Sequence, residues 1–156
     1  MPSFQLAGID HQPFEPLFER SDAGLRELGA IRRVATESPG FPCRVSLEDA
    51  APGEELLLLP FVHQPADSPY RASGPIFVRR GAARRVLEAG EVPPYITRRL
   101  ISVRVYDSAH MMISATVCEG PLVAAELERQ FDDRRVAYAQ LHNAKPGCFA
   151  CTVERA

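Results

Sequence analysis

The sequence predicts an α+β fold with a largely antiparallel, barrel-like sheet of about eight or nine short strands and two or three helices. Three observations lead to this class. Apolar and polar residues alternate over many short segments, most clearly in 100–106. The 14 prolines and 10 glycines fall largely between these segments, as is typical of turns. Helical spacing of apolar residues is confined to a few stretches.

In the first half of the chain, a short helix is expected to interrupt a series of strands. Ser21 is a typical N-cap residue and Gly29 a typical helix end, so the helix lies between them. The segment 43–47 alternates apolar and polar residues and is expected to be a strand. The other strands expected in this half are 4–9, 30–36, 55–62 and 76–80.

The second half is expected to hold three helical segments and the clearest hairpin. Helical spacing predicts a helix at 81–89, and two prolines favour a single helical turn at 95–99. The strands 100–106 and 111–118 flank a short turn and form the hairpin. A proline near the first turn and apolar residues four positions apart predict an amphipathic helix at 122–131. The last strands expected are 136–141 and 148–153.

Length and composition fit one domain spanning residues 1–156. A chain of 156 residues buries roughly 70% of its unfolded surface, which makes a core without disulfide bonds. No apolar run reaches the roughly 20 residues of a membrane helix, and the N-terminus lacks the pattern of a signal peptide. We therefore expect a cytoplasmic protein with no membrane partner. An exposed edge strand would be compatible with a homodimer.

The charge pattern argues against nucleic acid as a partner. The chain has five Arg-Arg pairs, but its formal net charge is -2 and its pI about 6.1. No aromatic residues interleave with the arginines to stack on bases. Most of these arginines are therefore expected on solvated faces of strands and helices.

The segment 61–75 carries the first candidate site. Its prolines stiffen it between two apolar strands, which would hold its polar side chains in place. His63 can act as a base or a ligand near neutral pH, and the fork of Arg71 suits a carboxylate or a phosphate. An ordinary loop that satisfies its own backbone would use similar residues. The candidate ligand-binding residues of this loop are His63, Tyr70, Arg71 and Ser73.

His142 and Asn143 follow another expected strand and are candidates for the opposite wall of the same site. Together with the loop they predict a pocket for a small, anionic molecule, used for binding or for catalysis. The sequence does not decide whether the protein is an enzyme. An arrangement of Cys148 or Cys43 with a histidine and an asparagine would suit nucleophilic chemistry, but it depends on contact distances.

The cysteines support two alternative functions. Cys148 and Cys151 form one C-x-x-C, which can supply two ligands of a tetrahedral zinc ion. With Cys43 and one histidine they would complete the site of a zinc-stabilised structural or interaction domain. The same pair could instead be a redox dithiol, although its flanks are expected to be turn and strand rather than a helix N-terminus. Plain core packing of the cysteines is the third interpretation.

Three blocks of the sequence carry a family resemblance: PCRVSLEDAAPGE (42–54), LLLPFVHQPADSPYRASGPIFVR (57–79) and HNAKPGCFACTVERA (142–156). They resemble the bacterial family numbered 1203 among the domains of unknown function. The resemblance covers essentially the whole chain. It implies a small, stand-alone, cytoplasmic bacterial protein, and it brings no activity with it.

Overall fold

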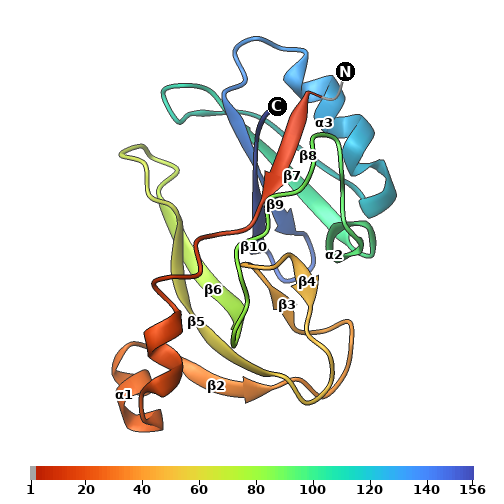
Figure 1. The fold of residues 1–156 in the computed structure, drawn as a ribbon. Helices are drawn as coiled ribbons and strands as arrows, with labels where there is room; N and C mark the ends of the chain where they lie inside the picture. The colour runs from red at the N-terminus through yellow and green to blue at the C-terminus, as the bar shows by residue number, and fades with distance from the viewer. Residues whose placement is uncertain (1–2) are drawn as a thin grey trace.

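The computed structural model describes residues 3–156, and in this part of the chain ten strands form two open, five-stranded sheets (Figure 1). The terminal sheet, which contains the first and the last strand, has the order β1-β10-β9-β7-β8 and is antiparallel throughout. The hairpin sheet, built on the β5–β6 hairpin, has the order β2-β5-β6-β3-β4. Its only parallel pair among the described residues is β3 with β6.

The bounds of the elements are as follows. The strands of the terminal sheet are β1 (Phe4–Ala7), β7 (Leu100–Tyr106), β8 (Met112–Glu119), β9 (Tyr138–Asn143) and β10 (Cys148–Arg155). Those of the hairpin sheet are β2 (Ile31–Val34), β3 (Pro42–Cys43), β4 (Glu48–Asp49), β5 (Glu55–Gln64) and β6 (Ala72–Arg79). The helices are η1 (Glu15–Glu19), α1 (Asp22–Glu27), α2 (Pro94–Thr97), η2 (Gly120–Leu122) and α3 (Val123–Phe131).

Each sheet has its own apolar core. In the core of the terminal sheet, the apolar face of α3 packs against β1 and β7 through Leu127 and Phe131. In the core of the hairpin sheet, η1 and α1 contribute Phe18 and Leu25. Phe149 belongs to β10 but packs in the core of the hairpin sheet, so this side chain joins the two halves of the fold.

The α+β class and the largely antiparallel pairing are confirmed, whereas the barrel-like closure is wrong. Neither sheet closes on itself: β1 and β8 are the outermost strands of one sheet, and β2 and β4 those of the other. The expected helix at 81–89 is also wrong. This segment is extended because it pairs with β1: Leu87 N donates to Leu6 O at 3.0 Å, and Gly8 N donates to Arg85 O at 2.8 Å.

The expected strand 43–47 is a tight turn between β3 and β4, and this correction matters for the site. Leu47 N donates to Cys43 O at 3.0 Å, and Leu47 has a positive φ of 53°. As a result Val45 packs in the core of the hairpin sheet and Leu47 in that of the terminal sheet. The alternating apolar residues of this segment are therefore divided between two cores and do not form one face of a strand. Gly8 allows the close approach, since a Cβ at this position would lie 2.0 Å from Val45 O.

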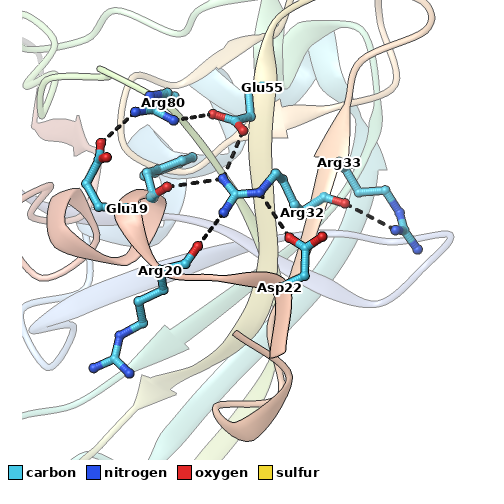
Figure 2. A network of polar contacts seen from close by, with 8 residues as sticks. Glu19, Arg20, Asp22, Arg32, Arg33, Glu55 and Arg80 are labelled. Carbon is cyan, nitrogen blue, oxygen red and sulfur yellow. Dashed lines mark hydrogen bonds and ion pairs between the residues drawn. The ribbon is translucent and has the colours of Figure 1, made fainter. Parts of the chain in front are cut away.

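An ion network fastens η1 and α1 to the hairpin sheet (Figure 2). Arg32 on β2 donates to Glu55 on β5 at 2.9 Å, and to the backbone oxygens of Phe18 and Arg20. Arg80 donates to the same Glu55 at 2.7 Å and to Glu19 at 2.6 Å. Some of the Arg-Arg pairs are therefore engaged with carboxylates rather than simply solvated.

Replacing Glu55 with Gln tests this network. The bonds from Arg80 and from Arg32 keep the pKa of Glu55 below its usual range. The stabilisation is therefore present at neutral pH and is lost as the pH falls through the lowered pKa of the folded state. We expect Glu55→Gln to lower the free energy of unfolding by about 1 kcal/mol at pH 7, because the network is partly exposed. Urea unfolding at pH 7 and pH 3 measures this loss.

The matched control is Glu154→Gln, which removes an exposed carboxylate that lies outside the ion pairs of the described residues. This variant should leave the stability nearly unchanged at both values of pH. A loss for Glu55→Gln that is as large at pH 3 as at pH 7 would contradict the proposed role of the carboxylate charge.

Candidate functional site

A cavity of about 770 Å³ lies between the two sheets, and we call it the inter-sheet cavity. The hairpin sheet and its turns contribute one wall, which includes Leu58, Phe77 and His63. The β9–β10 hairpin and the segment from α2 to β7 contribute the other wall. The polar and charged side chains of the lining are Arg44, His63, Ser73, Arg98, Arg99, Glu119, Asn143, Lys145 and Cys148.

Arg44 lines this cavity and is only 2% exposed. It belongs to the turn between β3 and β4, where Arg44 N donates to Phe77 O at 3.1 Å and Arg44 O accepts from Ile9 N at 3.1 Å. These backbone bonds fix the turn between β6 and the segment after β1. The side chain therefore enters the space between the sheets from a rigid support.

The guanidinium of Arg44 donates to groups on both sheets. Its Nη1 donates to Pro42 O at 2.7 Å, and its Nε donates to Phe149 O at 2.8 Å. Its Nη2 donates to the sulfur of Cys148 at 3.0 Å. Within residues 3–156 it forms no ion pair with a carboxylate. An arginine buried without a carboxylate is unusual, because a buried charge is costly unless it is paired.

Cys148 and Asn143 face each other where the β9–β10 hairpin begins. Gly147, with a φ of +76°, closes the turn of this hairpin, and its N–H donates to Asn143 O at 2.8 Å. Asn143 Nδ2 donates to Cys148 Sγ at 3.6 Å, so the sulfur accepts from two side chains. Asn143 is 4% exposed, and its Oδ1 has no hydrogen-bond partner among the described residues.

Two histidines share one glutamine beside the cavity. Gln140 Nε2 donates to His63 O at 2.8 Å, so Gln140 Oε1 is the acceptor for His63 Nδ1 at 2.9 Å and for His142 Nε2 at 3.2 Å. This pattern of contacts assigns the proton of each neutral ring. His63 keeps a free lone pair on Nε2, and His142 keeps one on Nδ1, which has no partner in the described chain.

Burial keeps both histidines neutral at physiological pH. It is the main cause that lowers the pKa of His63, and it lowers the pKa of His142 to about 3, with a further contribution from the charge of Arg104. The His63 ring also stacks on Phe149, with 5.4 Å between centroids and 9° between planes. Phe149 thus holds the ring of His63 at the wall of the cavity.

The rim of the cavity is cationic. Arg98 and Arg99 line it and pair with Asp49, whose side chain is 1% exposed; Arg99 Nη1 lies 3.1 Å from Asp49 Oδ2. Arg99 also packs over the ring of Tyr95. Lys145, in the β9–β10 turn, forms no ion pair with any residue from 3 to 156.

The structure brings only part of the predicted ligand-binding group together. His63, Ser73 and Asn143 line the cavity, and His142 lies directly behind His63, with 4.9 Å between ring centroids. Tyr70 and Arg71 are outside the lining. The expected loop is shorter than 61–75 because β5 extends to Gln64 and β6 begins at Ala72. Tyr70, near the end of the loop, packs against Tyr106 instead, and Arg71 is exposed.

The three cysteines considered as zinc ligands lie in different places. Cys43 is buried in the core of the hairpin sheet, and Cys151 in that of the terminal sheet, where burial raises the pKa of its thiol. Only Cys148 reaches the cavity. No group of three or more His, Cys, Asp or Glu side chains within 3–156 is arranged to hold a metal ion. Both cysteines of the C-x-x-C lie in β10, directly after a turn, and so not at a helix N-terminus.

Arg44 and Lys145 were not singled out by the sequence analysis. The only signal for Arg44 is a charged residue within an otherwise uncharged run, Phe41 to Leu47, and such a residue is ordinarily on the exposed face of a strand. Lys145 is the one lysine of the chain and lies in a Lys-Pro-Gly turn, which marks a turn without indicating what faces it.

The fold and cavity define a two-sheet α+β protein with a basic, cysteine-containing cleft between its sheets. A family model described as "Protein of unknown function (DUF1203)" matches residues 40–155, and the chain belongs to this family. The predicted membership is thereby confirmed. Every residue that lines the inter-sheet cavity falls within the matched range. Searches of curated proteins and of solved structures give no match.

The buried state of His142 makes a prediction about stability. The unfolded chain takes up a proton at this histidine near pH 6.5, whereas the folded chain does so near pH 3. Between these values the unfolded state binds more protons, so stability falls by up to about 1.4 kcal/mol for each pH unit on acidification. We expect His142→Gln to lose less stability than the wild type between pH 7 and pH 5 in urea unfolding.

The exposed His110 provides the comparison, since His110→Gln should retain the pH dependence of the wild type. If His142→Gln and the wild type lose the same stability over this range, His142 is not a buried neutral group.

Proposed function

We propose that the protein binds a small anionic molecule in the inter-sheet cavity. The observation that carries this proposal is the guanidinium of Arg44, which is buried at the cavity and forms no ion pair with a carboxylate of residues 3–156. Backbone carbonyls satisfy part of its hydrogen-bonding capacity but do not neutralise its charge. An anion in the cavity would supply the missing counter-charge.

The remaining lining supports the same ligand class. Four cationic residues line the cavity, and Glu119 is the one carboxylate among the lining residues. Asp49 pairs with Arg98 and Arg99 and balances part of their charge. Among the described residues, Lys145 and Arg44 have no such carboxylate partner and are available to a ligand. A concave site whose lining carries an excess of positive charge concentrates anions.

The size of the cavity favours a small molecule. A volume of about 770 Å³ lies within the range of roughly 300–1,000 Å³ that is usual for small-molecule sites. Leu58, Phe77 and Phe149 provide apolar walls, and Ser73 and Asn143 add neutral polar groups. This mixture of an apolar surface with a few converging polar groups is typical of ligand sites.

Two further proposals concern location and partners. No helix among residues 3–156 is long and apolar enough to cross a membrane. We propose that the protein works in the cytoplasm, because its four cysteines are free thiols, which a reducing compartment preserves. We further propose that nucleic acid is not a partner, since arginines at 32, 79, 80, 98, 99 and 135 already pair with carboxylates.

Binding of simple anions tests the proposed function. We expect inorganic phosphate or citrate to raise the unfolding temperature in a saturable manner, compared with sodium chloride at the same ionic strength. Lys145→Gln should require a concentration about two- to fivefold higher for the same shift, because an exposed charge contributes up to about 1 kcal/mol. Differential scanning fluorimetry gives the shifts, and isothermal titration calorimetry gives the affinities.

Arg134→Gln is the matched control, since it removes one positive charge from an exposed position outside the cavity. It should bind the anions as the wild type does. No saturable shift with either anion, or the same weakening in both variants, would overturn anion binding in this cavity.

A further inference from the structure

We infer that Cys148 is a nucleophile, and that its sulfur bonds covalently to an electrophilic carbon of a small anionic molecule bound in the inter-sheet cavity. The inference rests on the proposed function for the class of the ligand. It adds a chemical step and a residue that performs it. Three features of the site support it: the donors around the sulfur, the unsatisfied asparagine and the exposure of this cysteine compared with the other three.

The donors around the sulfur are those that a thiolate requires. Arg44 Nη2 donates to Cys148 Sγ at 3.0 Å, and Asn143 Nδ2 donates at 3.6 Å. A thiol is a weak acceptor, whereas a thiolate is a full anion and is the attacking form of cysteine. The guanidinium N–H beside the sulfur is suited to stabilise the negative charge that the sulfur carries when it attacks.

The unsatisfied oxygen of Asn143 points independently to a ligand. Asn143 lines the cavity and is 4% exposed, yet its Oδ1 has no partner among residues 3–156. A buried acceptor without a donor costs roughly 1–3 kcal/mol. A hydroxyl or amide group of a ligand beside Cys148 would donate to this oxygen. The same ligand position would bring its electrophilic carbon close to the sulfur.

Accessibility and position together separate Cys148 from the other cysteines. Cys43 and Cys151 are completely buried in the two cores. Cys118 is half-buried on β8, where burial and the charges of Glu126 and Glu119 raise the pKa of its thiol. Cys148 is half-buried and is the only one of the four that lines the inter-sheet cavity.

The chemical step is a nucleophilic substitution. The electron pair of the Cys148 thiolate forms a bond to the electrophilic carbon, and the leaving group departs with the electrons of its own bond. If the carbon belongs to a carbonyl, negative charge develops on its oxygen, and the N–H groups of Arg44 and Asn143 next to the sulfur are suited to stabilise it. His63, which lines the same cavity, offers the neutral Nε2 to a proton.

Alkylation by a charged and an uncharged reagent tests the inference on the intact protein. Iodoacetate and iodoacetamide undergo the same substitution with release of iodide, but only iodoacetate is an anion. We expect Cys148 to react faster than Cys118 with both reagents. The ratio of iodoacetate to iodoacetamide rate constants should be about tenfold higher at Cys148 than at Cys118, because a cationic cleft concentrates the anion. Peptide mass spectrometry over time gives both ratios in one sample.

Variants of exposed charged residues distinguish an effect of charge on the alkylation rates from a loss of folding. Lys145→Gln should lower the ratio at Cys148, whereas Arg134→Gln should leave it unchanged. Phosphate should slow alkylation of Cys148 but not of Cys118. Arg44→Gln should slow the reaction of both reagents at Cys148. Because Arg44 is buried, circular dichroism must first show that this variant is folded. If it is not folded, Lys145→Gln provides the test.

The outcomes distinguish this inference from the proposed function. If Cys148 reacts no faster than Cys118 with either reagent, it is not a nucleophile, even if phosphate still raises the unfolding temperature. If Cys148 reacts rapidly but without a preference for iodoacetate, the anionic class of its target is overturned. Fast alkylation with that preference, in a protein that phosphate protects at Cys148, supports both.

Discussion

A guanidinium buried between two sheets is the constraint on which the site depends. Arg44 is 2% exposed, and its donors are divided between the carbonyls of Pro42 and Phe149 and the sulfur of Cys148. Burial of an unpaired cation is unfavourable, so the surroundings must compensate it. Backbone dipoles do so in part. An anion in the cavity, beside the sulfur of Cys148, would complete the compensation of the Arg44 charge.

The architecture explains how this arrangement is held. The register of β10 against β9 shifts between Phe149 and Cys151. Phe149 therefore packs in the core of the hairpin sheet while Cys151 packs in that of the terminal sheet. The shift also leaves Phe149 O within reach of Arg44 Nε. Phe149 and Arg44 are thus two of the side chains through which the sheets meet, and both line the cavity between them.

Local sequence signals were sufficient for most elements and insufficient for the site. The helix N-cap at Ser21, the 100–106 hairpin strand and the periodicity of the 122–131 segment depend on neighbouring residues, and all three predictions are confirmed. The segments 43–47 and 81–89 were misassigned because tertiary contacts determine them. The first is held between two cores, and the second pairs with β1.

The candidate site could be predicted only in part, again because tertiary contacts determine the rest of it. His63, Ser73, Asn143 and Cys148 attract attention by residue type, and all four line the cavity. Arg44 gives no such signal, because an arginine in an alternating segment is ordinarily solvated. Its significance comes from burial without a carboxylate, which is a property of the assembled sheets.

The most direct test of this account is a double-mutant cycle between Arg44 and Cys148. The free energies of unfolding of the wild type, Arg44→Gln, Cys148→Ala and the double variant give the coupling between the two side chains. If the guanidinium and the sulfur form a charged hydrogen bond, the coupling should be about 1.5–3 kcal/mol. Effects that add to within about 0.5 kcal/mol would show that the two groups are only neighbours, and would contradict the account.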